Sequence, residues 1–146
     1  MRSVFVGLLL CSGVTVCGCA AGGPSGSSEA MPAAKHGGNI ISLPGNKGFA
    51  ELLLERDAPA KRGAAVAARL VAYFYQPDGA TALSPPPSDV KVHLGSAERG
   101  TDVKLTAAST PAGRFASETG QYPDELRGEL ALSLGGEPIQ APFAFR

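Results

Sequence analysis

Residues 126–145 read LRGELALSLGGEPIQAPFAF, and this stretch decides the fold. Its two halves place apolar side chains at alternate positions, namely Leu126, Leu130, Leu132 and Leu134, then Ile139, Ala141, Phe143 and Phe145. Because successive side chains of a strand point to opposite faces, each half predicts a strand with one buried face. Gly135-Gly136 favours a tight turn between them. Pro142 cannot donate to a strand ladder, so it favours an edge position.

The same period of two recurs upstream. Clear strands are expected at 89–94 and 101–106, and further candidates at 39–43, 49–56, 67–76 and 113–117. An alanine-rich start at 64–69 leaves a helix as the alternative for the 67–76 segment. Residues 120–125 are expected to form a loop. Short strands separated by turns predict an all-β, single antiparallel β-sandwich of about seven or eight strands. The architecture is immunoglobulin-like only in outline, because the chain has no tryptophan.

Length and charge narrow the function classes. The chain has 146 residues, which is typical of one domain. Its formal net charge is zero and it has no basic stripe, so we expect no binding to nucleic acid. All three cysteines lie within the first 19 residues, which leaves no cysteine pair for a metal site farther along the chain.

The N-terminal residues carry an export pattern. Arg2 precedes an apolar run over 4–16, which is shorter than the ~20 residues that a membrane-spanning helix needs. The tetrapeptide Val16-Cys17-Gly18-Cys19 resembles a bacterial lipobox, with an aliphatic residue three positions before the modified cysteine and a small residue just before it. The resemblance implies a signal peptide over 1–18 and lipid attachment at Cys19. An ordinary signal peptide cut after Ala20 or Ala21 is the alternative.

The resemblance also implies a location. Lipoproteins of this kind carry a diacylglycerol and an N-acyl chain such as palmitate on the cysteine, and several chains together anchor a protein stably. Ala20, where inner-membrane lipoproteins carry Asp, implies the outer membrane, with the protein facing the periplasm. Residues 19–38 are rich in small and polar side chains, so they predict an acylated cysteine followed by a flexible linker. The β-sandwich domain then spans 39–146.

Candidate chemistry is sparse after the signal peptide. His93 falls mid-strand on the face opposite the apolar positions, as a solvent-facing residue would. His36 lies where the linker meets the first strand, and alone it falls short of the three or four ligands of a useful metal site. Asp124-Glu125 are adjacent carboxylates in a loop, where their side chains diverge. No recognised catalytic motif occurs, so we expect no enzymatic activity, no cofactor and no metal, with His36 as the weak metal candidate.

A second resemblance rests on three segments. His36-Gly37-Gly38 precedes a strand, Glu51-Leu52 lies in the next one, and Tyr75 to Gly79 form a Y-x-x-D-G turn. This order resembles a small β-domain that accompanies periplasmic adaptor proteins of heavy-metal efflux systems. The spacing differs here, and the usual upstream histidine-rich segment is missing.

Three function classes follow from these patterns. The chain is expected to be a membrane-tethered, noncatalytic lipoprotein that binds or braces another envelope protein. The alternatives are an accessory of a heavy-metal efflux system and an enzyme with an unrecognised site. Function has to be decided at a site, because a fold of this kind serves many activities.

Overall fold

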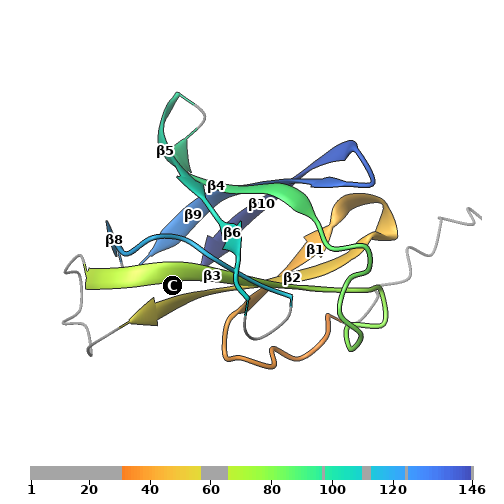
Figure 1. Ribbon diagram of the computed structural model, residues 1–146. Coiled ribbons are helices and arrows are strands. Elements are labelled where there is room, and N and C mark those ends of the chain that lie inside the picture. Colours follow the sequence, from red (N-terminus) through yellow and green to blue (C-terminus); the bar gives the residue numbers. More distant parts are fainter. Residues whose placement is uncertain (1–30, 57–65, 97, 110–112, 124, 146) are drawn as a thin grey trace, which may run out of the picture.

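A computed structural model describes residues 31–56, 66–96, 98–109, 113–123 and 125–145, which form two antiparallel sheets packed face to face (Figure 1). The all-β sandwich expected from the sequence is confirmed. In these ranges the only helical element is a short 3-10 turn, η1 (Pro44–Asn46). None of the described residues belongs to a helix long and apolar enough to cross a bilayer.

The described strands number ten and match most of the expected ranges. In chain order they are β1 (Asn39–Leu43), β2 (Gly48–Arg56), β3 (Val66–Tyr75), β4 (Ser88–Ser96), β5 (Arg99–Lys104), β6 (Thr106–Ala107), β7 (Arg114–Ala116), β8 (Gly120–Tyr122), β9 (Leu126–Leu134) and β10 (Glu137–Phe145). The segment around 67–76 is the strand β3, so its helical alternative is wrong. The count exceeds seven or eight because β6 and β8 are very short, and β8 lies where a loop was expected.

The first sheet has the order β1-β2-β3-β7-β6, and β8 also pairs with β3. Long strands β2 and β3 form its centre, with Glu51 opposite Tyr73 and Phe49 opposite Tyr75. The second sheet has the order β10-β9-β4-β5. Its β9–β10 hairpin pairs Leu134 with Glu137, as residues 126–145 predict, and β10 ends the order, which confirms the edge position of Pro142.

The chain changes sheets at Leu105. The expected strand over 101–106 divides into β5, which pairs with β4, and β6, which pairs with β7 in the other sheet. Leu105 between them is buried, and its backbone N–H donates to the Val90 carbonyl at 2.9 Å. A buried apolar residue therefore fixes the crossing.

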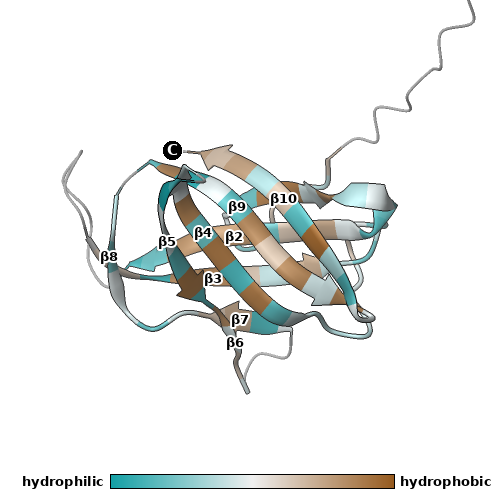
Figure 2. Ribbon diagram, turned by 90° about the horizontal axis from the view of Figure 1, so that it is seen from above, coloured by the Kyte–Doolittle hydropathy of each residue, from teal (hydrophilic) through white to brown (hydrophobic). Residues whose placement is uncertain are grey.

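The core lies between the sheets and follows the alternation of the sequence. Bands of opposite hydropathy alternate along β4, β9 and β10 in Figure 2. The inward side chains include Leu43, Leu52, Leu70, Val90, Val92, Leu126, Leu130 and Leu132, each at most 3 % exposed. Because this packing fixes the two sheets, it also fixes the positions of the polar groups on their outer faces.

Candidate functional site

The two outer faces differ in what covers them. The segment before β1, orange in Figure 1, passes under the sheet that contains β2 and β3. Glu51 points to that outer face, opposite the core residues Ala50 and Leu52, yet it is 0 % exposed. A buried carboxylate is costly unless hydrogen bonds compensate it, so its partners explain how the segment is held.

Four donors converge on the Glu51 carboxylate, and we call this arrangement the clamp. The backbone N–H groups of His36 and Gly38 donate to Oε1 at 2.7 and 2.9 Å. The Lys35 N–H and the Tyr75 hydroxyl donate to Oε2, both at 3.1 Å. Each carboxylate oxygen thus receives two hydrogen bonds, which ties the N-terminal segment to β2 and β3.

The clamp sets the ionisation of its members. Burial raises the pKa of Glu51, but the hydrogen bonds from Gly38, His36, Lys35 and Tyr75 outweigh it, so the net pKa lies below its ordinary value. Burial, followed by the neighbouring Glu51 charge, raises the pKa of Tyr75. At neutral pH the clamp therefore consists of a carboxylate and a neutral phenol, the pair that its donor and acceptor geometry requires.

Side chains from the same segment extend the clamp. The His36 ring stacks on Tyr73, with the ring centroids 3.8 Å apart and the planes 14° from parallel. Lys35 places its Nζ 4.7 Å from the centroid of the Tyr75 ring and donates to the Ala80 carbonyl at 2.5 Å. One face of the His36 ring is therefore engaged in a structural contact with Tyr73.

The segments that carry the efflux-domain resemblance meet at the clamp. His36 and Gly38 contact Glu51, and Tyr75 begins the turn in which Asp78 accepts hydrogen bonds from the Ala80 and Thr81 N–H groups at 2.8 and 2.9 Å. A Cβ atom on Gly38 would lie 2.8 Å from the Leu52 carbonyl oxygen, so this position needs glycine. The motif accordingly has a structural explanation in this chain.

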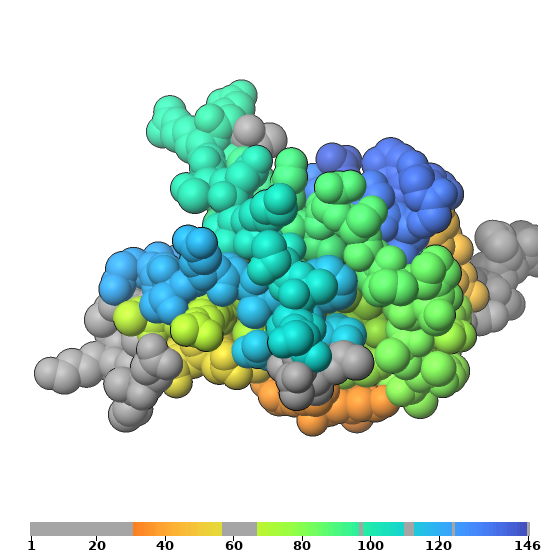
Figure 3. Space-filling view, in the orientation of Figure 1, coloured from red at the N-terminus to blue at the C-terminus, as the bar shows by residue number. Residues whose placement is uncertain are grey.

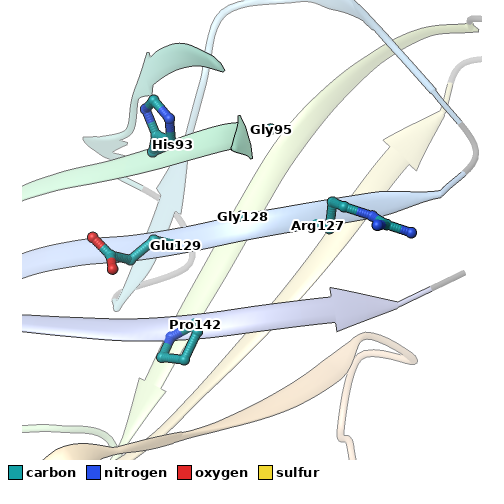
Figure 4. A pocket seen from close by; sticks show the side chains of 6 residues that line it. All are labelled: His93, Gly95, Arg127, Gly128, Glu129 and Pro142. Atoms are coloured by element: carbon teal, nitrogen blue, oxygen red, sulfur yellow. The ribbon is translucent and has the colours of Figure 1, made fainter. Parts of the chain in front are cut away.

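The outer face of the second sheet is open and carries a hollow of about 450 Å³ (Figure 4). We call this the hollow, lined by His93, Gly95, Arg127, Gly128, Glu129 and Pro142. Gly128 has a φ of 159°, and a Cβ atom there would lie 1.8 Å from the His93 carbonyl oxygen. Glycine thus allows β9 and β4 to approach closely beneath the hollow. The Arg127 and Glu129 side chains extend in opposite directions along β9.

His93 forms one wall of the hollow and is half-buried. Its Nδ1 lies 2.6 Å from Asp102 Oδ1, and its Nε2 lies 3.1 Å from the Ser96 carbonyl oxygen. The hydrogen bond to Asp102, followed by that to Ser96, raises the pKa of His93. A general base needs a free ring nitrogen that faces substrate. Here both nitrogens face protein acceptors, so this His–Asp pair is arranged as a structural link.

The remaining expected site residues are distributed as follows. Val16, Cys17, Gly18 and Cys19 lie outside the described residues, and so does Asp124. His36 and His93 lie on the outer faces of different sheets, on the clamp and in the hollow respectively. In the described part of the chain, no three His, Cys, Asp or Glu side chains gather where they could hold a metal ion.

Two residues of these sites were not among the candidate site residues expected from the sequence. Glu51 occupies a solvent-facing position by alternation, and only the covering segment buries it. Asp102 could have been found, because the sequence places a short loop between β4 and β5. A register that pairs Ser96 with Arg99 puts His93 directly opposite Asp102.

Comparisons with known proteins leave the sites to be interpreted from their own chemistry. No protein-family model matches the chain, and no curated protein or solved structure matches it significantly.

Proposed function

We propose that the protein is a membrane-tethered, noncatalytic lipoprotein that serves as a binding or structural module in the cell envelope. One observation carries this proposal. The outer face of the β2–β3 sheet is covered by the chain's own N-terminal segment, whereas the outer face of the other sheet keeps an open hollow lined in part by His93, Arg127 and Glu129. We therefore place the binding of another envelope protein on this second face.

The chemistry of the described polar groups supports a noncatalytic role. Glu51 has both carboxylate oxygens engaged by donors, and His93 has both ring nitrogens directed at acceptors. Catalysis by general acids and bases needs such groups free to exchange a proton with substrate. Their engagement favours a scaffold whose side chains fix structure.

The anchor is tested by metabolic labelling of the full chain. Wild-type protein should incorporate labelled palmitate and fractionate with the outer membrane. Cys19→Ala should remove both properties, whereas Cys17→Ala should retain them. Labelling that depends on Cys17 would contradict the assignment, and a wild-type protein without label would contradict the anchor itself.

Binding at the hollow is tested by photo-crosslinking in intact cells. A photoreactive amino acid at Arg127 should give an adduct with an envelope protein, and Glu129→Lys in the same chain should abolish it. The matched control is the same amino acid at Ser42, an exposed residue of β1 in the other sheet. Adducts of equal strength from both positions would contradict a specific binding face.

The alternative is an accessory of a heavy-metal efflux system, and the meeting of the His36, Glu51 and Tyr75 segments at the clamp supports it. It requires His36 to leave Tyr73 and to find ligands elsewhere. Calorimetric titration of the full chain with Zn²⁺ or Cu²⁺ decides between the two. Submicromolar one-to-one binding that His36→Ala abolishes would favour the efflux accessory over the scaffold. Weak binding that His36→Ala leaves unchanged would support the scaffold.

A further inference from the structure

The end of the β4–β5 hairpin is not paired with the neighbouring strand β9. The pairing of β9 with β4 ends at Leu94 and Gly128, whereas the pairing of β4 with β5 continues to Ser96 and Arg99. Residues 95–96 and 98–100 are exposed, and we call them the arm. In Figure 3 this end of the hairpin stands out from the body of the molecule. Without strand pairing to β9, its conformation depends largely on contacts within the hairpin.

His93 supplies two of those contacts from the base of the arm. Its Nδ1 faces the Asp102 carboxylate on β5, and its Nε2 faces the Ser96 carbonyl at the end of β4. Both partners are acceptors and neither can offer a proton. A neutral imidazole carries one N–H, and only the imidazolium carries two. The observed geometry is therefore complete only when His93 is protonated.

We infer that the His93 proton is a pH-dependent lock on the arm, through which the imidazolium holds the Ser96 carbonyl and the Asp102 carboxylate together. When the proton leaves, the remaining N–H stays with the charged acceptor Asp102, which makes the stronger hydrogen bond. Nε2 then presents a lone pair to the Ser96 carbonyl oxygen, and this repulsion releases the end of the arm.

The charges around His93 favour the locked form without fixing it. Two negative residues lie opposite His93 on the neighbouring strands, Asp102 on β5 and Glu129 on β9. Lys91 on β4, Lys104 on β5 and Arg127 on β9 lie on the same outer face and are positive, while β10 contributes the uncharged Pro142. The hydrogen bond to Asp102 and then that to Ser96 keep the pKa of His93 above its ordinary value near 6.5. The lock is consequently full below about pH 6.5 and opens as pH rises through the higher folded value.

This inference goes beyond the proposed function, and its test reads the hairpin itself, with no need of a partner or a membrane. Nuclear magnetic resonance on the full chain in detergent follows the ring signals of His93 against pH, with His36→Ala used for assignment. The native pKa should exceed that of the urea-unfolded chain. Asp102→Asn should lower it, whereas Asp89→Asn, which removes an equal charge elsewhere on the hairpin, should leave it almost unchanged.

Two further readouts separate a lock from a simple charge effect. Ser96→Ala should leave the pKa of His93 unchanged, because the acceptor is the backbone carbonyl. Protection of the Thr101 amide from exchange, corrected for intrinsic pH dependence, should fall about fivefold across the titration, as expected for the loss of one hydrogen bond. A native pKa equal to or below the unfolded value, a pKa insensitive to Asp102→Asn, or protection that does not change would each overturn the proposal.

Discussion

The clamp and the arm both depend on one titratable side chain, but they place it in opposite surroundings. Glu51 is buried between the covering segment and β2–β3, and four donors from two parts of the chain, residues 35–38 and Tyr75, meet it. His93 lies at the base of an exposed hairpin, and its two acceptors come from that same hairpin. The first arrangement joins distant segments, whereas the second adjusts a local one.

The difference lies in what happens when the hydrogen bonds break. At the clamp, a lost charge leaves several N–H groups facing a site that water does not reach, which is costly. At the arm, water replaces the lost partner at once. The free-energy difference between the locked and the released form is therefore small and follows pH. The clamp therefore belongs to the stability of the fold, and the arm can respond to conditions.

The clamp and the arm lie on sheets that pack on one core, so a truncation in this core is the reference for the effects of variants at both sites. Leu132→Ala removes a core side chain of β9 that is 3 % exposed. Buried leucine truncations leave a cavity, so we expect the free energy of unfolding to fall by ~2–5 kcal/mol. Urea unfolding followed by circular dichroism measures it. A loss below ~1 kcal/mol would contradict the core packing on which both outer faces rest.

At the clamp, Glu51→Gln keeps the size of the side chain but removes its charge and directs an amide NH₂ at N–H donors. We expect the free energy of unfolding to fall by ~2–4 kcal/mol, because hydrogen bonds to charged groups are the strong ones. Tyr75→Phe is the matched control that removes a single donor, and it should cost ~1 kcal/mol. Equal, small losses for both changes would show that Glu51 is not the centre of the clamp.

Acid distinguishes the clamp from the arm, because the stabilising contribution of Glu51 is lost as pH falls and that of His93 is lost as pH rises. The pKa of Glu51 is lowered in the folded chain, so its contribution to stability is present above the unfolded pKa of about 4.5 and is lost as pH falls through the folded value. Stability should decline below about pH 4.5 in the wild type and less steeply in Glu51→Gln. Unfolding midpoints in urea between pH 3 and pH 7 test this, and parallel curves would contradict it.

The smallest effect is expected at the arm. Asp102→Asn removes an exposed charge partner, and surface pairs contribute little to global stability. The urea midpoint at pH 6 should therefore move far less than with Glu51→Gln, in spite of the change in the His93 titration. A loss as large as that of the clamp variant would show that the arm is integral to the fold.

Most of the strands could be predicted from the sequence because apolar residues alternate along them, as they do over residues 126–145. The change of sheets at Leu105 could not, because the alternation continues through it while the pairing partner changes. Likewise, the alternation places Glu51 outward correctly, but only the return of residues 35–38 buries it. Part of the expected linker therefore contacts the domain, and the pattern of a single segment does not reveal which distant segment will cover it.

Native-state hydrogen exchange of the full chain at neutral pH tests the contrast between clamp and arm most directly. The amides of His36 and Gly38, although they precede the first strand, should exchange only with global unfolding and as slowly as those in the centre of β2. The amide of Thr101, which is paired with Leu94 near the arm, should exchange faster, through local opening. Rapid exchange at His36 and Gly38, at the rate of an unstructured linker, would contradict the clamp and with it the assignment of the second sheet as the free face.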